Sequence, residues 1–376
     1  MRILQVAQKP QRRGAEMFAY DLSRQLRRLG HTVKQVYLYP SEGDGALPLF
    51  GEDECLNGNE THLSERSIGY NPGLLRRLTN SIGRFAPEIV QVNGARAVKY
   101  GALARKKPPA TGWKLVYRNI GDPRRWTGWR HRLFYGRWVM PQIDGIVGVS
   151  QATLEAVMRL YDLRIPSVQL ARAIDPQALL PSKSPAEVRA GLHTPRDAPV
   201  LLYVGSLTAE KRVDRLLRIT RAARGRVPGL RLWIIGDGPL RLALEREADR
   251  IGLDGAALFA GVRQDVARYM QAADLLALTS ETEGIPGVIL EAGWMGLPTI
   301  AMNVGGVAEC LRPEETGALI DDGDEGAFTE AVVRLLETSE ERRRMGSNAH
   351  DWIAERFTIG PVADRYVEFY ESLSSR

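Results

Sequence analysis

Short apolar runs alternate with amphipathic stretches along the first half of the chain. The run ILQVA (3–7) precedes the helical pattern AEMFAYDLSRQLRRLG, which Gly30 ends, and the next apolar run is HTVKQVYLY (31–39). Further apolar runs, each ending in polar residues or glycine, occupy 87–94, 114–121 and 145–150. Strands that alternate with helices in this way predict a parallel sheet with helices on both faces.

The same pattern restarts after residues 168–189, which carry prolines and no clear period. Apolar runs then recur at 198–207, 229–239, 256–261, 274–279, 297–302 and 317–320. We therefore predict an α/β protein with two doubly wound, Rossmann-like domains that face each other across a cleft. The predicted domains are 1–170 and 171–355, and a terminal helix at 356–376 crosses back to the first domain. Ligands of such sheets bind beyond the carboxyl ends of the strands, so the residues after each strand are the candidates for function.

Composition adds little that is specific. The chain has 376 residues, 44% hydrophobic and 26% charged, as in an ordinary globular protein of about two domains. We expect no secretory signal and no apolar run of the about 20 residues that cross a bilayer. Cys55 and Cys310 lie far apart without a CxxC partner, which argues against structural zinc and fits a reducing cytosol. The net charge of +6 favours an anionic partner, but charge does not rank nucleic acid, membrane and small molecules.

The stretch ETEGIPGVILEAG (281–293) carries the most informative chemistry. Pro286 suits the first turn of a helix, and a helix that starts near Gly287 would direct free N–H groups at an anion such as phosphate. Glu291 follows one turn later, and Glu283 precedes the helix. A carboxylate accepts both protons of a vicinal diol, so a diphosphate with a diol at each end, a nucleotide sugar, would satisfy the whole stretch. Two surface glutamates beside a helix start would also fit the helix dipole.

The wider sequence resembles the retaining glycosyltransferases of family four (glycosyl transferase group 1), which have the GT-B fold. The resemblance rests on the Glu283-x7-Glu291 spacing, the following EAG…GLP, Gly305-Gly306 and Glu309. It extends to VGSLTAEKRVDRLL (204–217), IIGDGP, FAGVRQDV and, near the start, RGAEMFAYDLSRQLRRLGHTV, and so covers nearly the whole chain.

The resemblance implies a role for individual residues. Glu291 would hold the ribose hydroxyls, Glu283 the hydroxyls of the transferred sugar, and Lys211 would neutralise the diphosphate and assist its departure. The remaining donor-binding residues implied are Gly14, Gly205, Ser206, Val262, Arg263, Gly284, Ile285, Gly287 and Val288.

Three positions depart from the family pattern. Ser206 stands where the family often has arginine, so Arg212 or Arg263 would have to supply a second cation. Arg13-Gly14 replaces a pair of glycines, and Gln91 and Asn93 stand where many members have a histidine after the strand.

No histidine is expected after a strand that faces the cleft. The family's proposed mechanism tolerates this, because the departing phosphate oxygen takes the proton of the acceptor. Asn93 would then position the sugar or the acceptor. For the acidic stretch DDGD (321–324) we expect helix capping, and we predict neither a catalytic metal nor a cofactor beyond the nucleotide-sugar co-substrate.

The stretch 117–138 combines tryptophans and arginines with a single acid, Asp122. A packed helix with a basic outer face would explain it. It would equally suit a docking surface for an anionic, lipid-linked acceptor or for the membrane itself. On that second interpretation Asp122 orients an acceptor hydroxyl, and the acceptor-binding residues are Arg13, Asn93, Arg118, Arg124 and Arg125.

Together these features predict a retaining, metal-independent glycosyltransferase of the hexosyltransferase type, with Lys211, Glu283, Asn93 and Asp122 as catalytic residues. The donor would be a UDP- or GDP-linked sugar and the acceptor a hydroxyl of a polysaccharide, glycolipid or other envelope glycoconjugate precursor. We expect the protein in the cytoplasm, peripheral to the inner face of the membrane, without a nucleic-acid partner.

Three other functions fit parts of the sequence. A sugar-nucleotide epimerase of the same fold would need an acid/base pair at the sugar. A basic nucleic-acid-binding protein would leave the Glu283–Glu291 spacing unexplained. An NAD dehydrogenase would need the G-x-G-x-x-G that the first loop lacks.

Overall fold

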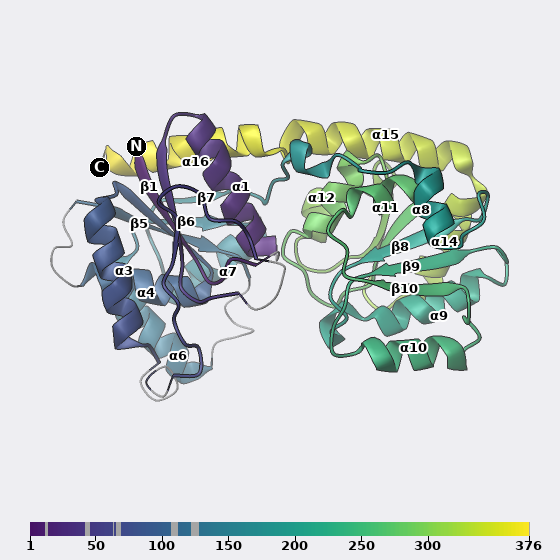
Figure 1. Cartoon of the computed structure of the whole chain (residues 1–376), viewed down its shortest axis with the longest axis horizontal. Coiled ribbons are helices and arrows are strands. Elements are labelled where there is room, and N and C mark those ends of the chain that lie inside the picture. The colour runs from purple at the N-terminus through teal and green to yellow at the C-terminus, as the bar shows by residue number, and fades with distance from the viewer. Residues whose placement is uncertain are drawn as a thin grey trace. The chain divides into compact units, whose positions relative to one another are not determined.

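The computed structural model of the chain describes residues 1–11, 14–41, 46–62, 64, 69–106, 112–121 and 128–375, without the side chains of Trp129 and Arg130. It divides into two compact units (Figure 1). The first unit comprises Met1–Ala173 together with Ile359–Arg376, and the second unit comprises Ile174–Thr358.

A parallel sheet forms the centre of the first unit, with the described strands in the order β3-β2-β1-β4-β5-β6-β7. The strands are β1 (Arg2–Ala7), β2 (Thr32–Tyr37), β3 (Glu54–Cys55), β4 (Ile89–Asn93), β5 (Lys114–Asn119), β6 (Gly145–Gly148) and β7 (Ser167–Gln169). The described helices are α1 (Gly14–Arg28), α3 (Pro72–Phe85), α4 (Ala95–Arg105), α6 (Trp129–Phe134), α7 (Gln151–Tyr161) and α16 (Ile359–Ser374), with short π and 3-10 turns at η1 (Tyr135–Val139) and η2 (Met140–Gln142).

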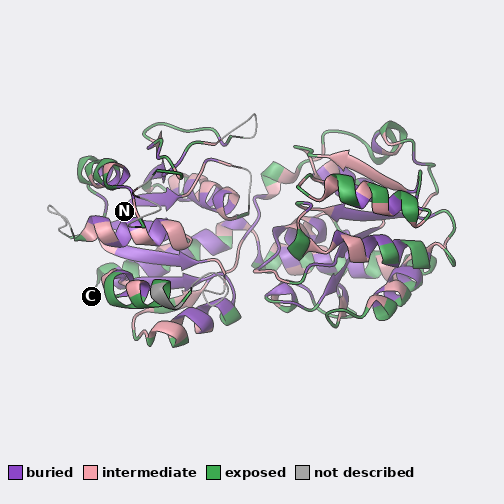
Figure 2. Cartoon of the chain, turned by 90° about the horizontal axis from the view of Figure 1, so that it is seen from below, coloured by how far each residue is buried: buried purple, intermediate pink, exposed green. Residues whose placement is uncertain are grey.

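Successive residues along the strands of the first sheet point to opposite faces, and each face carries an apolar layer, as expected of a parallel sheet that helices cover on both sides. Leu4 and Val92 pack with α3 and α4 on one face, whereas Ile3 and Ile89 pack with α1 and α16 on the other. Figure 2 shows the buried residues along the strands and the exposed residues on the outer faces of the helices.

A polar network lies in the second of these layers, where α16 covers the sheet. The Tyr370 hydroxyl donates to Oε1 of Gln91 at 2.6 Å and accepts from Nε2 of Gln5 at 3.4 Å. Nε2 of Gln91 and Nδ2 of Asn93 both donate to Oε1 of Gln5, at 3.1 and 3.0 Å. All four side chains are buried, so these bonds fix where α16 sits along the strands.

The second unit repeats the arrangement, with the described strands in the order β10-β9-β8-β11-β12-β13, all parallel. The strands are β8 (Val200–Val204), β9 (Arg231–Ile235), β10 (Ala257–Gly261), β11 (Leu275–Leu278), β12 (Thr299–Met302) and β13 (Gly317–Ile320). The helices and 3-10 turns are η3 (Pro176–Leu179), α8 (Pro185–Gly191), η4 (Ala209–Lys211), α9 (Val213–Ala223), α10 (Arg241–Arg250), α11 (Ala267–Ala272), α12 (Gly287–Trp294), α13 (Val307–Cys310), α14 (Glu325–Glu337) and α15 (Ser339–Arg356).

The predicted class, an α/β protein with two doubly wound parallel sheets, is confirmed. β3 and β7 are not among the predicted strands, because strands of two and three residues are too short to show a period. The chain passes from the first unit to the second between Ala173 and Ile174. The boundary predicted from the sequence lies three residues earlier, after residue 170. None of the described helices is both long and apolar enough to span a membrane.

We predict that Tyr370→Phe destabilises the first unit by about 1–3 kcal/mol, because the carbonyl of Gln91 would stay buried without its donor. Thermal unfolding of the purified protein measures the effect as a lower transition temperature. Tyr70→Phe is the matched control, since the Tyr70 ring is only partly buried at the edge of the other layer. Equal unfolding temperatures for the two variants would contradict a structural role of the network.

Candidate functional site

Two loops meet at the point where the strand order of the second sheet reverses. β8 and β11 are neighbours there, and their following loops, 205–212 and 279–286, lie at the same carboxyl edge. The N–H of Glu281 donates to the carbonyl of Glu210 at 2.8 Å. The buried Thr279 hydroxyl contacts the carbonyls of Arg212 and Lys211, at 3.0 and 3.3 Å. A reversal of this kind is the usual ligand site of open α/β sheets.

The contact between these loops brings together two predicted catalytic residues. Nζ of Lys211 lies 2.7 Å from Oε1 of Glu283, although the two residues are 72 positions apart. The Ser280 hydroxyl donates to the same oxygen, also at 2.7 Å. The side chains of Lys211 and Glu283 are 23% and 10% exposed, so the pair is largely enclosed but still reaches solvent.

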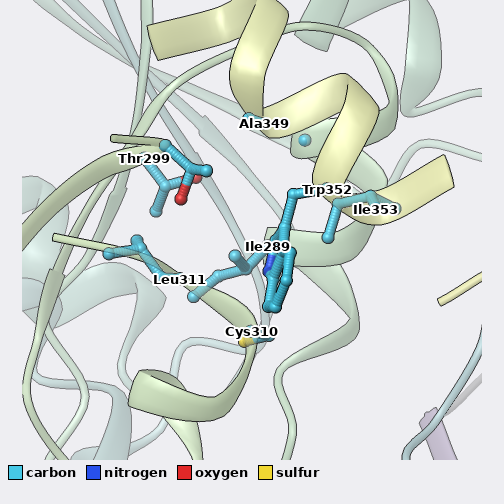
Figure 3. Close-up of a pocket in the computed structure, with 9 residues that line it drawn as sticks. Ile289, Thr299, Cys310, Leu311, Ala349, Trp352 and Ile353 are labelled. Carbon is cyan, nitrogen blue, oxygen red and sulfur yellow. The ribbon is translucent and has the colours of Figure 1, made fainter. Parts of the chain in front are cut away.

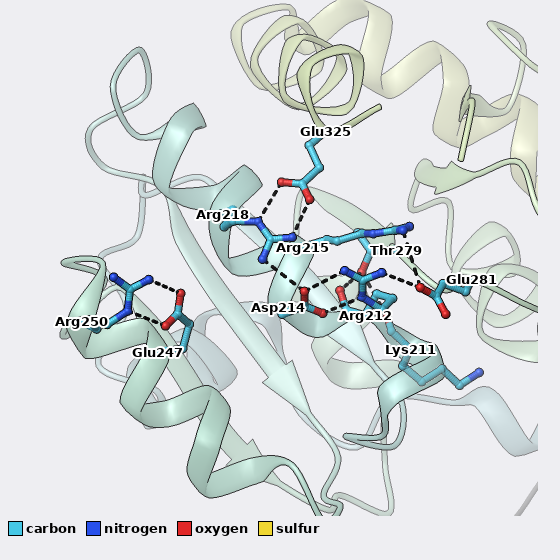
Figure 4. A network of polar contacts seen from close by, with 10 residues as sticks. All are labelled: Lys211, Arg212, Asp214, Arg215, Arg218, Glu247, Arg250, Thr279, Glu281 and Glu325. Atoms are coloured by element: carbon cyan, nitrogen blue, oxygen red, sulfur yellow. Dashed lines mark hydrogen bonds and ion pairs between the residues drawn. The ribbon is translucent and has the colours of Figure 1, made fainter. Parts of the chain in front are cut away.

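Arg212, the last residue of the 205–212 loop, is held by ion pairs. Its backbone is left-handed, with φ of 48°. Its Nε and Nη2 each donate to Asp214 at 3.0 Å, and its Nη1 donates to Glu281 (Figure 4). Hydrogen bonds to Asp214 and then to Glu281 raise the pKa of Arg212. Since two carboxylates already neutralise this guanidinium, Arg263, exposed after β10, remains the better candidate for a second cation.

Glycines in the loops that follow the neighbouring strands β9 and β12 lie close to the backbone of both loops. A Cβ added to Gly305, where φ is 56°, would lie 1.9 Å from the carbonyl oxygen of Glu283. A Cβ added to Gly236 would lie 1.9 Å from the carbonyl oxygen of Gly205. Only glycine permits such close contact between backbones, which explains the Gly305-Gly306 pair in the sequence.

The helix that follows the Glu283 loop begins at Gly287, as the sequence predicts, but Pro286 lies one position before its first turn. α12 starts at Gly287 with Pro286 as its N-cap, and no side chain caps its first N–H groups. Gly284, Val288 and Glu291 are partly buried along this loop and helix, and Ile285 is buried. α12 thus begins four residues after Glu283 in the chain, and the N-terminus of a helix is suited to an anion.

The other donor-binding residues predicted in the second unit lie at the same edge of the sheet. Gly205 and Ser206 follow β8, and the Tyr203 hydroxyl donates to the carbonyl of Ser206 at 2.9 Å. Burial and then the charge of Glu283 raise the pKa of Tyr203, so its hydroxyl stays protonated. Val262 and Arg263 follow β10, two strands away from β8, and Val262 is 72% exposed.

Gly14 and Asn93 lie near the corresponding reversal of the first sheet, between the neighbouring strands β1 and β4: Gly14 follows β1, and Asn93 is the last residue of β4. Gly14 begins α1, and a Cβ added there would lie 2.7 Å from Nη1 of Arg172. Asn93 is buried, and its amide donates to Gln5 and, at 3.2 Å, to the carbonyl of Val6. Asn93 thus belongs to the polar network beneath α16.

Arg118 differs from its prediction as a residue of a docking surface. It is buried beneath α16, where its Nε donates to the Tyr366 hydroxyl at 3.2 Å and its guanidinium lies 4.1 Å from the centre of the Phe18 ring. Desolvation lowers the pKa of Arg118. The reason is strand alternation, because residue 118 of β5 faces α16. Four further predicted residues, Arg13, Asp122, Arg124 and Arg125, lie outside the described residues.

The acidic stretch 321–324 has structural partners. Asp324 accepts from the N–H of Ala327 at 2.8 Å and caps α14, as predicted, and Asp322 pairs with Arg215 at 2.7 Å. Within the described ranges, no group of three or more His, Cys, Asp or Glu could hold a metal ion.

A small cavity lies behind α12 (Figure 3). Ile289 and Gly293 of α12 line it with Cys310, Trp352 and Ile353, and its volume is about 10 Å³. This is room for about one water molecule, so the cavity is no substrate site.

Sequence reasoning missed the residues that connect the two loops. Thr279 and Ser280 stand directly after β11, the position that should have drawn attention to them, but neither carries charge. The ion pair between Arg212 and Glu281 also gave no signal in the sequence, because the two residues lie 69 positions apart along the chain.

Both halves of the chain match known families. Residues 186–352 match the family described as Glycosyl transferases group 1, and residues 12–177 match Glycosyltransferase Family 4. The lipopolysaccharide core biosynthesis glycosyltransferase LpsE of Rhizobium meliloti is 30% identical over 184 residues, which cover 49% of this chain and 53% of LpsE. The GDP-mannose-dependent alpha-mannosyltransferase of Mycobacterium tuberculosis is 29% identical over 319 residues, covering 80% of this chain and 77% of that enzyme.

In its matches to LpsE, to LpsD of Rhizobium meliloti and to a D-inositol 3-phosphate glycosyltransferase of Saccharomonospora viridis, the chain spans 53%, 54% and 58% of their length. Among solved structures, Anabaena HepE in complex with UDP and glucose superposes with a TM-score of 0.82 at 19% identity, covering 99% of this chain and 100% of HepE. Likeness at this level of identity establishes the fold, and the expected GT-B architecture is confirmed.

We predict that Gly305→Ala displaces the Glu283 loop, since the added methyl group cannot fit against the carbonyl of Glu283. The matched control is Gly323→Ala, where φ is also positive but an added Cβ meets nothing within 4 Å. Thermal unfolding should show Gly305→Ala to be less stable than the control by about 1–3 kcal/mol. If the two variants are equally stable, the contact does not constrain the loop.

Proposed function

Because the chain belongs to the group 1 glycosyl transferases, we propose that it moves a sugar from a nucleotide-sugar donor to a hydroxyl acceptor. The donor binds at the carboxyl edge of the second sheet. The observation that carries this proposal is the Lys211–Glu283 pair, whose glutamate stands four residues before the start of α12. A cation, a carboxylate and helix N–H groups match the parts of a diphosphate-linked sugar.

Each part of the donor has a partner in this proposal. Lys211 and the first N–H groups of α12 bind the diphosphate and stabilise the charge that develops as it leaves. Glu283 accepts hydroxyls of the transferred sugar, and Glu291, one turn into α12, accepts those of the ribose. Val262 and Arg263 lie beside the base. UDP- and GDP-linked donors both have support, from the UDP named for HepE and the GDP-mannose named for the mycobacterial relative.

We further propose that transfer retains the configuration of the anomeric carbon and needs no divalent cation. A leaving phosphate oxygen on the face where the acceptor attacks can take the acceptor's proton, so no separate base is required. Lys211 then supplies the positive charge that a metal would otherwise provide. The acids of the 321–324 stretch support this view, because Asp322 and Asp324 are engaged in an ion pair and a helix cap.

The acceptor is proposed to be an envelope glycoconjugate precursor, a polysaccharide or glycolipid, consistent with the lipopolysaccharide core named for the LpsE relative. The first unit would bind it. Asn93 remains a candidate only if its amide exchanges a partner within the polar network, and Asp122, Arg13, Arg124 and Arg125 remain predictions from the sequence.

A surface of the first unit supports contact with an anionic membrane. On α6 and η1, Leu133 is 67% exposed and Trp138 is 52% exposed. Nζ of Lys106 lies 4.3 Å from the centre of the Trp138 ring, and Arg132 and Arg137 are exposed beside them. Exposed apolar side chains among cations suit the headgroup region of an anionic bilayer.

The donor site is tested first by thermal shift with UDP, GDP, ADP and dTDP and their common sugars. One nucleotide should stabilise the protein by about 2.7 kcal/mol at a hundredfold excess over its dissociation constant. Glu291→Ala should abolish most of that stabilisation, because the ribose loses its acceptor. A protein that none of these nucleotides stabilises would refute the donor site.

The preferred donor then serves in a transfer assay with an envelope glycolipid acceptor, followed by NMR of the product. We expect the anomeric configuration of the donor to be kept and the rate to be unchanged by EDTA. Inversion, or loss of activity restored by Mn²⁺, would overturn the mechanism. Epimerisation of the nucleotide sugar without transfer would favour the epimerase instead.

Membrane contact is tested by co-sedimentation with vesicles. The wild type should bind vesicles that contain phosphatidylglycerol and release them at high salt, and it should not bind neutral phosphatidylcholine vesicles. The double variant Leu133→Ala/Trp138→Ala should bind several-fold more weakly. Leu242→Ala, which removes a leucine that is 68% exposed in the second unit, is the control. Equal binding by all variants would exclude the α6–η1 surface as the site of membrane contact.

A further inference from the structure

The Glu283 carboxylate has a second donor besides Lys211. Both hydrogen bonds end on Oε1, from Lys211 Nζ and from Ser280 Oγ, and each measures 2.7 Å. Ser280 is fully buried directly after β11, whereas Lys211 reaches the carboxylate from the other loop on a long side chain. One partner of the carboxylate is therefore rigid and the other can turn away.

The proposed reaction makes different demands on these two partners. When a nucleotide sugar enters, the Lys211 ammonium is drawn toward the diphosphate, which carries more negative charge than a single carboxylate. Glu283 then loses part of its compensation at the moment when its orientation toward the sugar matters. A largely buried carboxylate without a fixed donor would change rotamer or lose affinity for the sugar hydroxyls.

The neighbouring hydroxyl has a different task. Thr279 Oγ1 is directed at the carbonyls of Lys211 and Arg212, so it holds the backbone of the other loop. Within the described part of the chain, the Ser280 hydroxyl has one hydrogen-bond partner, the side chain of Glu283.

We propose that Ser280 is a positioning residue for the sugar end of the donor. Its hydroxyl keeps Oε1 of Glu283 in place after Lys211 has turned to the diphosphate, so that the carboxylate presents its remaining acceptor sites to the sugar. This inference rests on the proposed function and concerns only how the transferred sugar is held.

The test compares Ser280→Ala with Ser184→Ala, using the full-length protein and the donor found by thermal shift. Ser184 is a matched control, because its hydroxyl also donates to a glutamate, Glu187, at 2.7 Å, in the exposed cap of α8. For Ser280→Ala we expect kcat/KM for the nucleotide sugar to fall about tenfold to a hundredfold, the size expected for a bond to a charged group. The Kd of the corresponding nucleoside diphosphate, measured by calorimetry, should stay within about twofold. Ser184→Ala should change neither quantity.

A second pair covers the case in which Ser280→Ala does not fold. Ser280→Thr and Ser280→Val have nearly the same shape and differ in the hydroxyl, so only the threonine variant should retain sugar transfer. Equal kcat/KM for Ser280→Ala and Ser184→Ala would overturn the proposal. A parallel loss of nucleoside diphosphate affinity would also overturn it, since that result indicates a general structural role. Failure of the proposed function has its own outcome, a wild type that binds no nucleotide.

Discussion

The contact between Lys211 and Glu283 depends on a single feature of topology, the neighbouring positions of β8 and β11. Parallel strands that lie side by side bring their following loops to one edge, and here the order of strands reverses between them. The two charges are too enclosed to be left unpaired without cost, so each compensates the other. In the proposed complex the diphosphate takes the place of Glu283 beside Lys211, and the sugar hydroxyls take the place of Lys211 beside Glu283. The ion pair thus marks the two positions at which the donor is proposed to bind.

The loops that carry this pair are held by backbone contacts as well as by charge. Gly236 lies against Gly205 and Gly305 lies against Glu283, so each loop is braced by the loop after an adjacent strand. On the far side, Arg212 connects Asp214 with Glu281. A site built this way keeps its geometry before the ligand arrives, and little binding energy is then spent on ordering it.

The first unit shows why polar residues after a strand are insufficient to predict a site. Asn93 is the last residue of β4 and Arg118 is the second-last residue of β5, so both stand where residues of a ligand site would. In the structure both side chains turn toward the layer beneath α16, where Arg118 meets Tyr366 and Asn93 joins Gln5. The terminal helix that covers both side chains lies more than two hundred positions further along the chain. The local sequence around Asn93 and Arg118 therefore does not predict this contact.

The sequence by itself determined the two parallel sheets, because apolar runs alternating with amphipathic helices can be buried in few other ways. It also predicted the start of α12 near Gly287, although Pro286 forms the N-cap of the helix and not part of its first turn. Only the tertiary structure decided which side chains meet. The partners of Glu283 are Lys211, from a distant loop, and Ser280, whose hydroxyl resembles any other in the sequence. Such contacts depend on strand order and on the face to which each residue points, and these are properties of the folded chain.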